Sequence, residues 1–149
     1  MTWFPVLLVI HIALAIGLLV PSVILPFILR RSDGPPGPVT GALMAMQGTG
    51  TLVIGVGLAI TGAAMVFILG PELLTQPWLL VALTLYALNL VVAAFISRPN
   101  LRRLIGLRSG TADDGTWRRR ARAQRLIAYG MAGVIGVIGF LMSTKPDLW

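Results

Sequence analysis

The chain alternates long apolar segments with short charged ones. Only a helix satisfies its own backbone hydrogen bonds in lipid, and a bilayer core about 30 Å thick needs about 20 helical residues. Four segments long enough for this contain no Asp, Glu, Lys or Arg, and they cover residues 3–29, 34–71, 73–97 and 126–144. The pattern therefore predicts an all-α fold, a four-helix transmembrane bundle with helices at about 3–29, 45–69, 77–97 and 125–143.

Proline and glycine set the predicted helix ends. Residues 34–38 read Gly-Pro-Pro-Gly-Pro, which breaks a helix and predicts a loop before the second span. The Gly-Pro pair at 70–71 closes the second helix, and Pro77 opens the third, where its missing N–H does no harm. We expect the Ser-Arg-Pro-Asn sequence at 97–100 to end the third helix.

The segment 98–124 is predicted to be a basic loop between the last two spans. Thr116 can cap a helix that begins at Trp117 and runs into the final span. Because this loop is too short for an independent domain, we expect one membrane domain over residues 1–149. No positive charge precedes the first apolar segment, so we expect a retained helix rather than a signal peptide.

The composition agrees with this pattern. Hydrophobic residues make up 56% of the chain and charged residues only 11%, whereas soluble domains carry about 25% charged residues. This shortfall excludes a soluble globular protein, a disordered chain and a free nucleic-acid-binding module. The mean hydropathy of +0.88 favours a multi-pass membrane protein.

The basic residues predict the orientation. With four spans, every arginine falls in or beside the two connections on one side, and Lys145 alone lies on the other side. The positive-inside rule then places these connections in the cytoplasm and both termini outside. We expect the arginine cluster to contact anionic lipid headgroups, with an acidic partner or a nucleic acid as the alternative. Its members are Arg118, Arg119, Arg120, Arg122 and Arg125. The charge belongs to one membrane face, so we predict no nucleic-acid partner.

His11 is the one ionisable group inside a predicted span, apart from tyrosines. It lies about 12 Å below the outer surface and should face the bundle interior. It is a candidate haem or chlorin axial ligand, or a proton relay. The other interpretation is a neutral imidazole that bonds another helix, with Thr61 as the expected partner at a similar depth. A single histidine and no cysteine exclude multi-histidine and thiolate metal sites, so we predict no metal site.

Small and polar residues indicate how the helices pack. Glycines recur every three residues in the last helix, and Thr51, Gly55 and Ala59 form a small-residue face on the second. Such faces let helices approach closely in lipid, either within the bundle or as a flat slot for a macrocycle or another protein's helix. Asn89, one turn after Tyr86, is expected to form an inter-helix hydrogen bond. The glycines of the last helix are Gly130, Gly133, Gly136 and Gly139.

Three segments together resemble a known family. They are residues 7–13 around His11, the Pro77-Trp78-Leu79 opening of the third helix, and residues 142–146. The chain is similar to an uncharacterised family of small four-helix bacterial membrane proteins, which looks related to HemJ-type protoporphyrinogen oxidases and to the membrane part of CopD-type copper proteins. In the HemJ-type enzymes the histidine of the first helix is implicated in haem binding, so the resemblance implies a haem ligand at His11.

Three hypotheses for function follow. The first is a non-catalytic subunit or accessory protein that packs through its glycine faces against helices of a larger respiratory or photosynthetic assembly. The alternative is a haem b-binding oxidoreductase of the HemJ type, with His11 as axial ligand. The third is a lipid- or quinol-binding protein with a cleft beside Pro21 and Pro26.

Overall fold

The computed structural model describes residues 3–31, 37–108 and 114–146, and no strand occurs in these residues. The elements in chain order are α1 (Trp3–Arg31), α2 (Pro38–Ala45), the π-helical turn η1 (Met46–Gly50), α3 (Thr51–Leu69), the 3₁₀ turn η2 (Pro71–Thr75), α4 (Pro77–Val92), the π-helical turn η3 (Ala93–Ser97), α5 (Arg98–Arg108) and α6 (Asp114–Thr144). The predicted all-α class is confirmed.

The elements form four helices that are long and apolar enough to cross a membrane. Two of them are continuous through a π-helical turn, because α2, η1 and α3 follow one another directly, as do α4, η3 and α5. The predicted number of candidate spans is therefore confirmed. Their bounds are Trp3–Arg31, Pro38–Leu69, Pro77–Leu107 and Gly115–Thr144.

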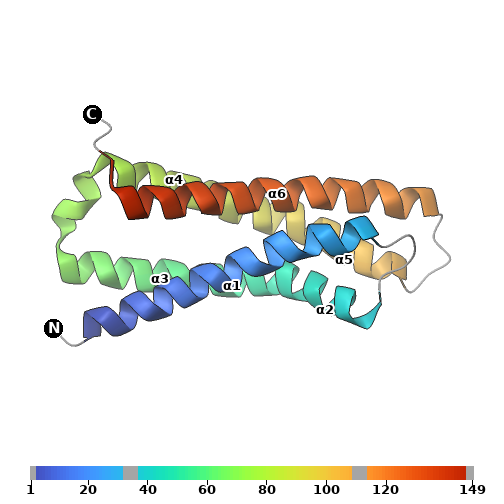
Figure 1. Ribbon diagram of the computed structural model, residues 1–149, viewed down its shortest axis with the longest axis horizontal. Helices are drawn as coiled ribbons and strands as arrows, with labels where there is room; N and C mark the ends of the chain where they lie inside the picture. The colour runs from blue at the N-terminus through green and yellow to red at the C-terminus, as the bar shows by residue number, and fades with distance from the viewer. Residues whose placement is uncertain (1–2, 32–36, 109–113, 147–149) are drawn as a thin grey trace.

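The four helices run along one long axis (Figure 1). α1 contacts both α3 and α6, and α6 also packs against α4. The start of α1, the turn η2 and the end of α6 lie at one end of the bundle, which we call the outer end. The end of α1, the start of α2, α5 and the start of α6 lie at the opposite end, which we call the basic end (Figure 1).

The turn between α3 and α4 has the predicted residues at its corners. Gly70 takes a φ of +107°, a backbone conformation that residues with a Cβ rarely adopt, and its N–H donates to the carbonyl of Val66. Pro71 then opens η2, and Pro77 occupies the first turn of α4. The predicted helix ends at residues 69 and 77 are confirmed.

Two other predicted boundaries are wrong, because the helix continues where we expected it to begin or end. The second helix begins at Pro38 rather than near residue 45, and the third runs past residue 97 to Arg108. A π-helical turn occupies each expected boundary. At η3 the N–H of Arg98 reaches back five residues to Ala93, and this wider turn makes room for Pro99 without breaking the helix.

The segment 98–124 is mostly helical, so the predicted loop is also wrong. α5 covers its first part, and α6 begins at Asp114, before the predicted start at Trp117. Apolar residues three apart, Leu101 and Leu104, give α5 one buried face, while Arg102 and Arg103 remain exposed.

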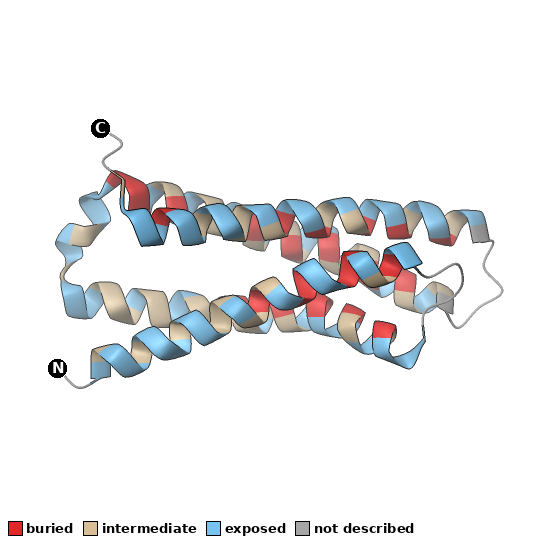
Figure 2. Ribbon diagram, in the orientation of Figure 1, coloured by how far each residue is buried: buried red, intermediate tan, exposed pale blue. Residues whose placement is uncertain are grey.

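The main hydrophobic core lies at the basic end rather than in the middle of the bundle (Figure 2). The buried residues of this core come from α1, α2, α5 and the first turns of α6. They are Leu25, Leu29, Met44, Leu101, Leu104, Trp117 and Ala121. Water drives apolar burial, whereas lipid does not, so a dense core is expected where a membrane bundle extends beyond the bilayer.

Candidate functional site

His11 lies between α1 and α3, where its ring is half-buried. Its Nδ1 is 2.8 Å from the hydroxyl oxygen of Thr61, which confirms the predicted partner. The ring also lies against Gly62, since a Cβ added there would be 3.3 Å from the His11 Cε1 atom. Gly62 therefore gives the imidazole room beside the backbone of α3.

The bonds around Thr61 bear on which imidazole nitrogen carries the proton. The Thr61 hydroxyl can donate within its own helix, where the carbonyl oxygens of Gly57 and Leu58 both lie 3.0 Å away. When its one proton goes to a carbonyl, the hydroxyl oxygen accepts from Nδ1–H of His11; in the other tautomer of His11 the hydroxyl donates to Nδ1 instead. The first case concerns the haem hypothesis. In the neutral ring this leaves the lone pair on Nε2, the atom through which a histidine would bind a haem iron. In the described part of the chain, no three His, Cys, Asp or Glu residues gather where they could hold a metal ion.

The third helix meets the second at Gly55. The Tyr86 hydroxyl donates a hydrogen bond to the Gly55 carbonyl, and a Cβ on Gly55 would lie 2.6 Å from Cδ2 of Leu90. Gly55 is buried, as a close helix contact requires. Gly55 therefore lies at the contact between α3 and α4, on the helix face for which we expected a packing role.

Asn89 does not make the inter-helix hydrogen bond that we expected. Its side chain is buried, yet it forms no hydrogen bond with any residue that the structure describes. Tyr86, one turn earlier, makes the bond between helices instead. The longer Tyr86 side chain reaches the backbone of α3, so the bond between these helices comes from the residue one turn before the one we expected.

The glycines of α6 face outward. Gly130, Gly133, Gly136 and Gly139 are exposed, and a Cβ on any of them would meet nothing within 4 Å. At 100° per residue, positions three apart step back by about 60°, so Gly130 and Gly139 lie on opposite sides of the helix and only adjacent members of the row can face the same neighbour. Packing of these glycines against the chain's own helices is therefore wrong, and packing with another chain or a macrocycle stays a prediction.

The basic end contains a buried polar network that the sequence did not reveal. Gln124, fully buried in α6, donates through Nε2 to the Ser97 hydroxyl at 2.9 Å, and its Oε1 accepts from the Asn100 amide at 3.0 Å. The network joins α6 to η3 and α5. A sequence signal existed, because Ser97 and Asn100 are three apart on one helix face. We had assigned both to a helix end and a loop.

Buried polar atoms without a partner also gather near this network. Both amide atoms of Gln47, in the turn η1, are buried without a hydrogen bond to the described residues. The same holds for Nε of Arg98 and Nε1 of Trp117. Such groups cost free energy unless water reaches them, so this end of the bundle is the natural place for internal water.

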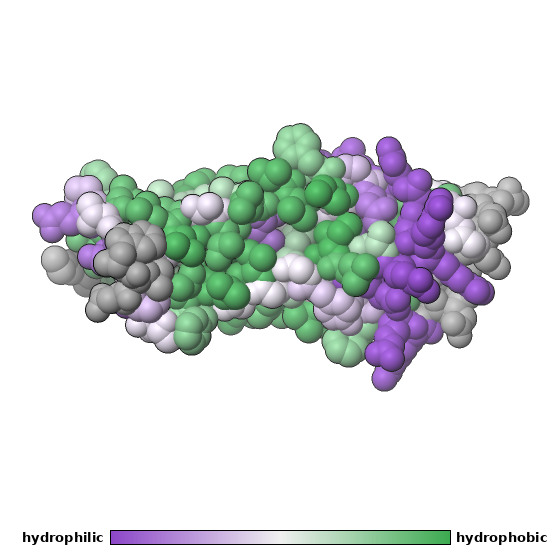
Figure 3. Space-filling model, turned by 90° about the horizontal axis from the view of Figure 1, so that it is seen from above, coloured by the Kyte–Doolittle hydropathy of each residue, from purple (hydrophilic) through white to green (hydrophobic). Residues whose placement is uncertain are grey.

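Every arginine of the chain lies at the basic end, where charged side chains form a band beside the apolar surface (Figure 3). The predicted headgroup arginines all lie in the first half of α6. Arg118, Arg119 and Arg122 are exposed, and Arg120 and Arg125 are partly buried. The structure therefore brings all five into one charged band, which is the arrangement that contact with headgroups requires.

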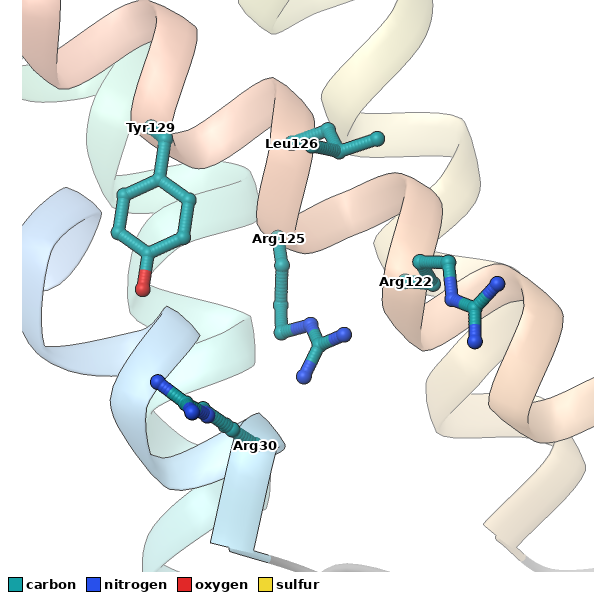
Figure 4. A pocket seen from close by; sticks show the side chains of 5 residues that line it. All are labelled: Arg30, Arg122, Arg125, Leu126 and Tyr129. Atoms are coloured by element: carbon teal, nitrogen blue, oxygen red, sulfur yellow. The ribbon is translucent and has the colours of Figure 1, made fainter.

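One open pocket of about 250 Å³ is lined by only two of these five arginines. It lies between the end of α1 and one face of α6, and it is lined by Arg30, Arg122, Arg125, Leu126 and Tyr129 (Figure 4). Arg118, Arg119 and Arg120 do not line it. Pro21 and Pro26, beside which the third hypothesis places a cleft, are buried and do not line this pocket.

No family model, no curated protein and no solved structure matches the chain. The resemblance to the HemJ-type and CopD-type proteins therefore stays a prediction. The functional proposal therefore rests on the geometry of the chain itself.

Proposed function

We propose that the chain crosses the bacterial inner membrane four times as one membrane domain, with the basic end in the cytoplasm and both termini outside. Four helices of sufficient length and apolarity support this topology. The position of every arginine at one end supports the orientation, because positive residues are retained on the cytoplasmic side.

Within that membrane we propose a non-catalytic subunit or accessory protein of a larger respiratory or photosynthetic assembly. The observation that carries this proposal is the open glycine row on α6, where no atom lies within 4 Å of the added Cβ positions. Residues three apart form a row inclined about 45° to the helix axis, so glycines along it leave an oblique groove. A transmembrane helix of another protein that crosses α6 obliquely can seat its side chains at two adjacent glycines of the row, such as Gly133 and Gly136.

Lipid makes this use of glycine effective. Apolar side chains gain little by leaving lipid for another helix, so association depends on close backbone approach, van der Waals packing and Cα–H···O contacts. The inward face of α6 already uses Trp117, Ala121, Gln124, Ala128 and Met131 to meet its own bundle. The glycine row is thus additional to the packing that the fold itself needs.

The test is purification in mild detergent followed by mass spectrometry of the co-purifying proteins. We expect a membrane protein in constant ratio to the wild-type chain and its loss from the Gly133→Leu/Gly136→Leu double variant. Ala63→Leu, at an exposed small residue of α3, adds the same kind of side chain elsewhere and should retain the partner. A wild-type chain that purifies alone, or only with copies of itself, would contradict the accessory role.

The second candidate function is a haem b-binding oxidoreductase. The observation that favours it is the bond from His11 to Thr61, since it leaves the Nε2 lone pair for an iron when Nδ1 carries the proton. The chain supplies one histidine, so a second histidine ligand would come from another chain. An absorption spectrum of the purified protein tests this function. A haem b protein should show a Soret band that His11→Ala abolishes and Thr61→Val shifts. No Soret band in the wild type would exclude this function.

A further inference from the structure

The pocket between α1 and α6 differs from the rest of the charged band because arginines of two helices line it. Arg122, Arg125, Leu126 and Tyr129 follow the spacing of a single helix face, and Arg30 approaches from α1. In Figure 4 the Arg125 side chain extends into the gap between the two helices, and the Tyr129 hydroxyl points towards α1. Three guanidinium groups and a phenol thus border one space.

These cations have no counter-charge among the residues that the structure describes. In the part of the chain that the structure describes, no carboxylate pairs with Arg30, Arg122 or Arg125, and none of them donates a side-chain hydrogen bond. Like charges gathered in one pocket repel each other, and an anion placed between them removes that repulsion. Guanidinium groups match phosphate oxygens especially well, because each can donate two parallel hydrogen bonds.

The rest of the pocket is apolar and faces outward. Leu126 is 68% exposed, and Phe27 packs edge-to-face on Tyr129 with ring centroids 6.5 Å apart. Arg30 follows the apolar part of α1, and Arg125 precedes the apolar part of α6, so the pocket lies where the charged band meets the apolar surface. A free phosphate would use only the arginines, whereas a phospholipid would also cover this apolar wall with an acyl chain.

We propose that this pocket binds the phosphate of an anionic phospholipid, with Arg30, Arg122 and Arg125 around the headgroup and Leu126, Phe27 and Tyr129 along the acyl chain. The inference goes beyond the accessory role, because it adds Arg30 and separates two arginines of α6 from their neighbours. It depends on the proposed membrane location, but binding in detergent tests it without reference to orientation or to any partner protein.

The experiment is native mass spectrometry of the full-length chain in detergent at about 0.15 M salt, titrated with dioleoylphosphatidylglycerol. Dioleoylphosphatidylcholine, with no net charge, and inorganic phosphate are the comparison ligands. We expect the anionic lipid to bind at least about ten times more tightly than the neutral one. Arg30→Gln and Arg125→Gln should each weaken its binding about five-fold.

Two further variants separate the pocket from the general positive field. Arg118→Gln also removes one positive charge from α6, but about 10 Å along the helix from Arg125. Because that distance is near the screening length, the substitution should change lipid binding less than about two-fold. Tyr129→Phe keeps the ring on Phe27 and removes only the hydroxyl, so it should weaken binding less than the arginine variants do.

Three results would overturn the proposal. They are equal binding of the neutral and anionic lipids, an equal loss in Arg118→Gln and Arg125→Gln, and inorganic phosphate that displaces the lipid at equal concentration. The last result would assign the pocket to a free anion. None of them bears on the partner-capture test, so this inference and the proposed function can fail separately.

Discussion

At the residue scale, the outer half of the bundle depends on a few specific contacts between helices. His11 bonds Thr61, and Tyr86 bonds the Gly55 carbonyl. In lipid such bonds contribute about 0.6–2 kcal/mol each, because apolar burial adds little there. The fit of small residues beside these bonds is therefore as important as the bonds themselves.

Gly55 and Gly136 offer a direct comparison of this fit. Gly55→Leu would place a side chain where Leu90 already lies and would separate the Tyr86 hydroxyl from α3. We expect it to lower the free energy of unfolding by about 1–3 kcal/mol. Gly136→Leu points into open space and should leave stability within about 0.5 kcal/mol. Thermal unfolding in detergent measures both, and equal losses would contradict the assigned roles.

The polar network at Gln124 gives a second prediction at this scale. Gln124→Ala would leave the buried Ser97 hydroxyl without its donor, and the partly buried Asn100 amide with only its 3.4 Å bond to the Arg120 carbonyl. We expect a loss of about 1–3 kcal/mol, since an unpaired buried polar group carries its full desolvation cost. A double-mutant cycle with Asn100→Ala measures the coupling. Additive losses from the two substitutions would show that the network does not act as a unit.

At the element scale, the helices of the basic end pack more densely than the apolar spans. α5 and the first turns of α6 enclose Leu104, which is fully buried, whereas Leu83 of α4 is 43% exposed on the apolar surface. This follows from the solvent, because apolar burial is driven by water. The segment that we expected to be a loop therefore holds the main core.

That difference predicts unequal costs for the same truncation. Leu104→Ala removes a fully buried side chain and should cost about 2–5 kcal/mol. Leu83→Ala removes a side chain that already faces outward, and its cost should be well below 1 kcal/mol. Unfolding of both variants in detergent provides the measurement. A larger loss at Leu83 would place the stabilising core in the apolar spans instead.

The elements also show what could be predicted from sequence. Charge-free segments of sufficient length identify the four spans, because the cost of a charge in lipid is a local property of the chain. The path of the helix through Pro99 was not predictable in this way, since proline ends most helices and the π-helical turn that accommodates it precedes it. The spacing of Leu101 and Leu104 is typical of an amphipathic helix, but we gave more weight to Pro99 as a helix end.

Among the candidate residues, the prediction that used only a residue's position along its helix agreed best with the structure. The His11–Thr61 bond followed from counting residues along two antiparallel helices. Asn89 and the glycines of α6 failed because the side that a residue faces depends on helix rotation, which a sequence of uniformly apolar spans does not record. The pocket at Arg30 joins helices far apart in sequence, so only the fold could reveal it.

At the scale of the whole molecule, the chain divides into two parts. In the proposed arrangement an apolar bundle with an open glycine row occupies the membrane, and a core formed in water carries every arginine at one end. The accessory role, the lipid pocket and the unequal truncation costs all need the apolar part in lipid and the basic end in water, and the proposed topology places that end in the cytoplasm. The orientation is thus the central claim.

Single-cysteine labelling tests this orientation most directly, because the chain contains no cysteine of its own. Thr75→Cys places a thiol on the exposed turn η2 at the outer end, and Arg103→Cys places one on the exposed face of α5. A membrane-impermeant maleimide is applied to intact spheroplasts and to lysed ones. We predict that Cys at position 75 reacts in both preparations, and that Cys at position 103 reacts only after lysis. Reaction at position 103 in intact spheroplasts, with protection at position 75, would contradict the account.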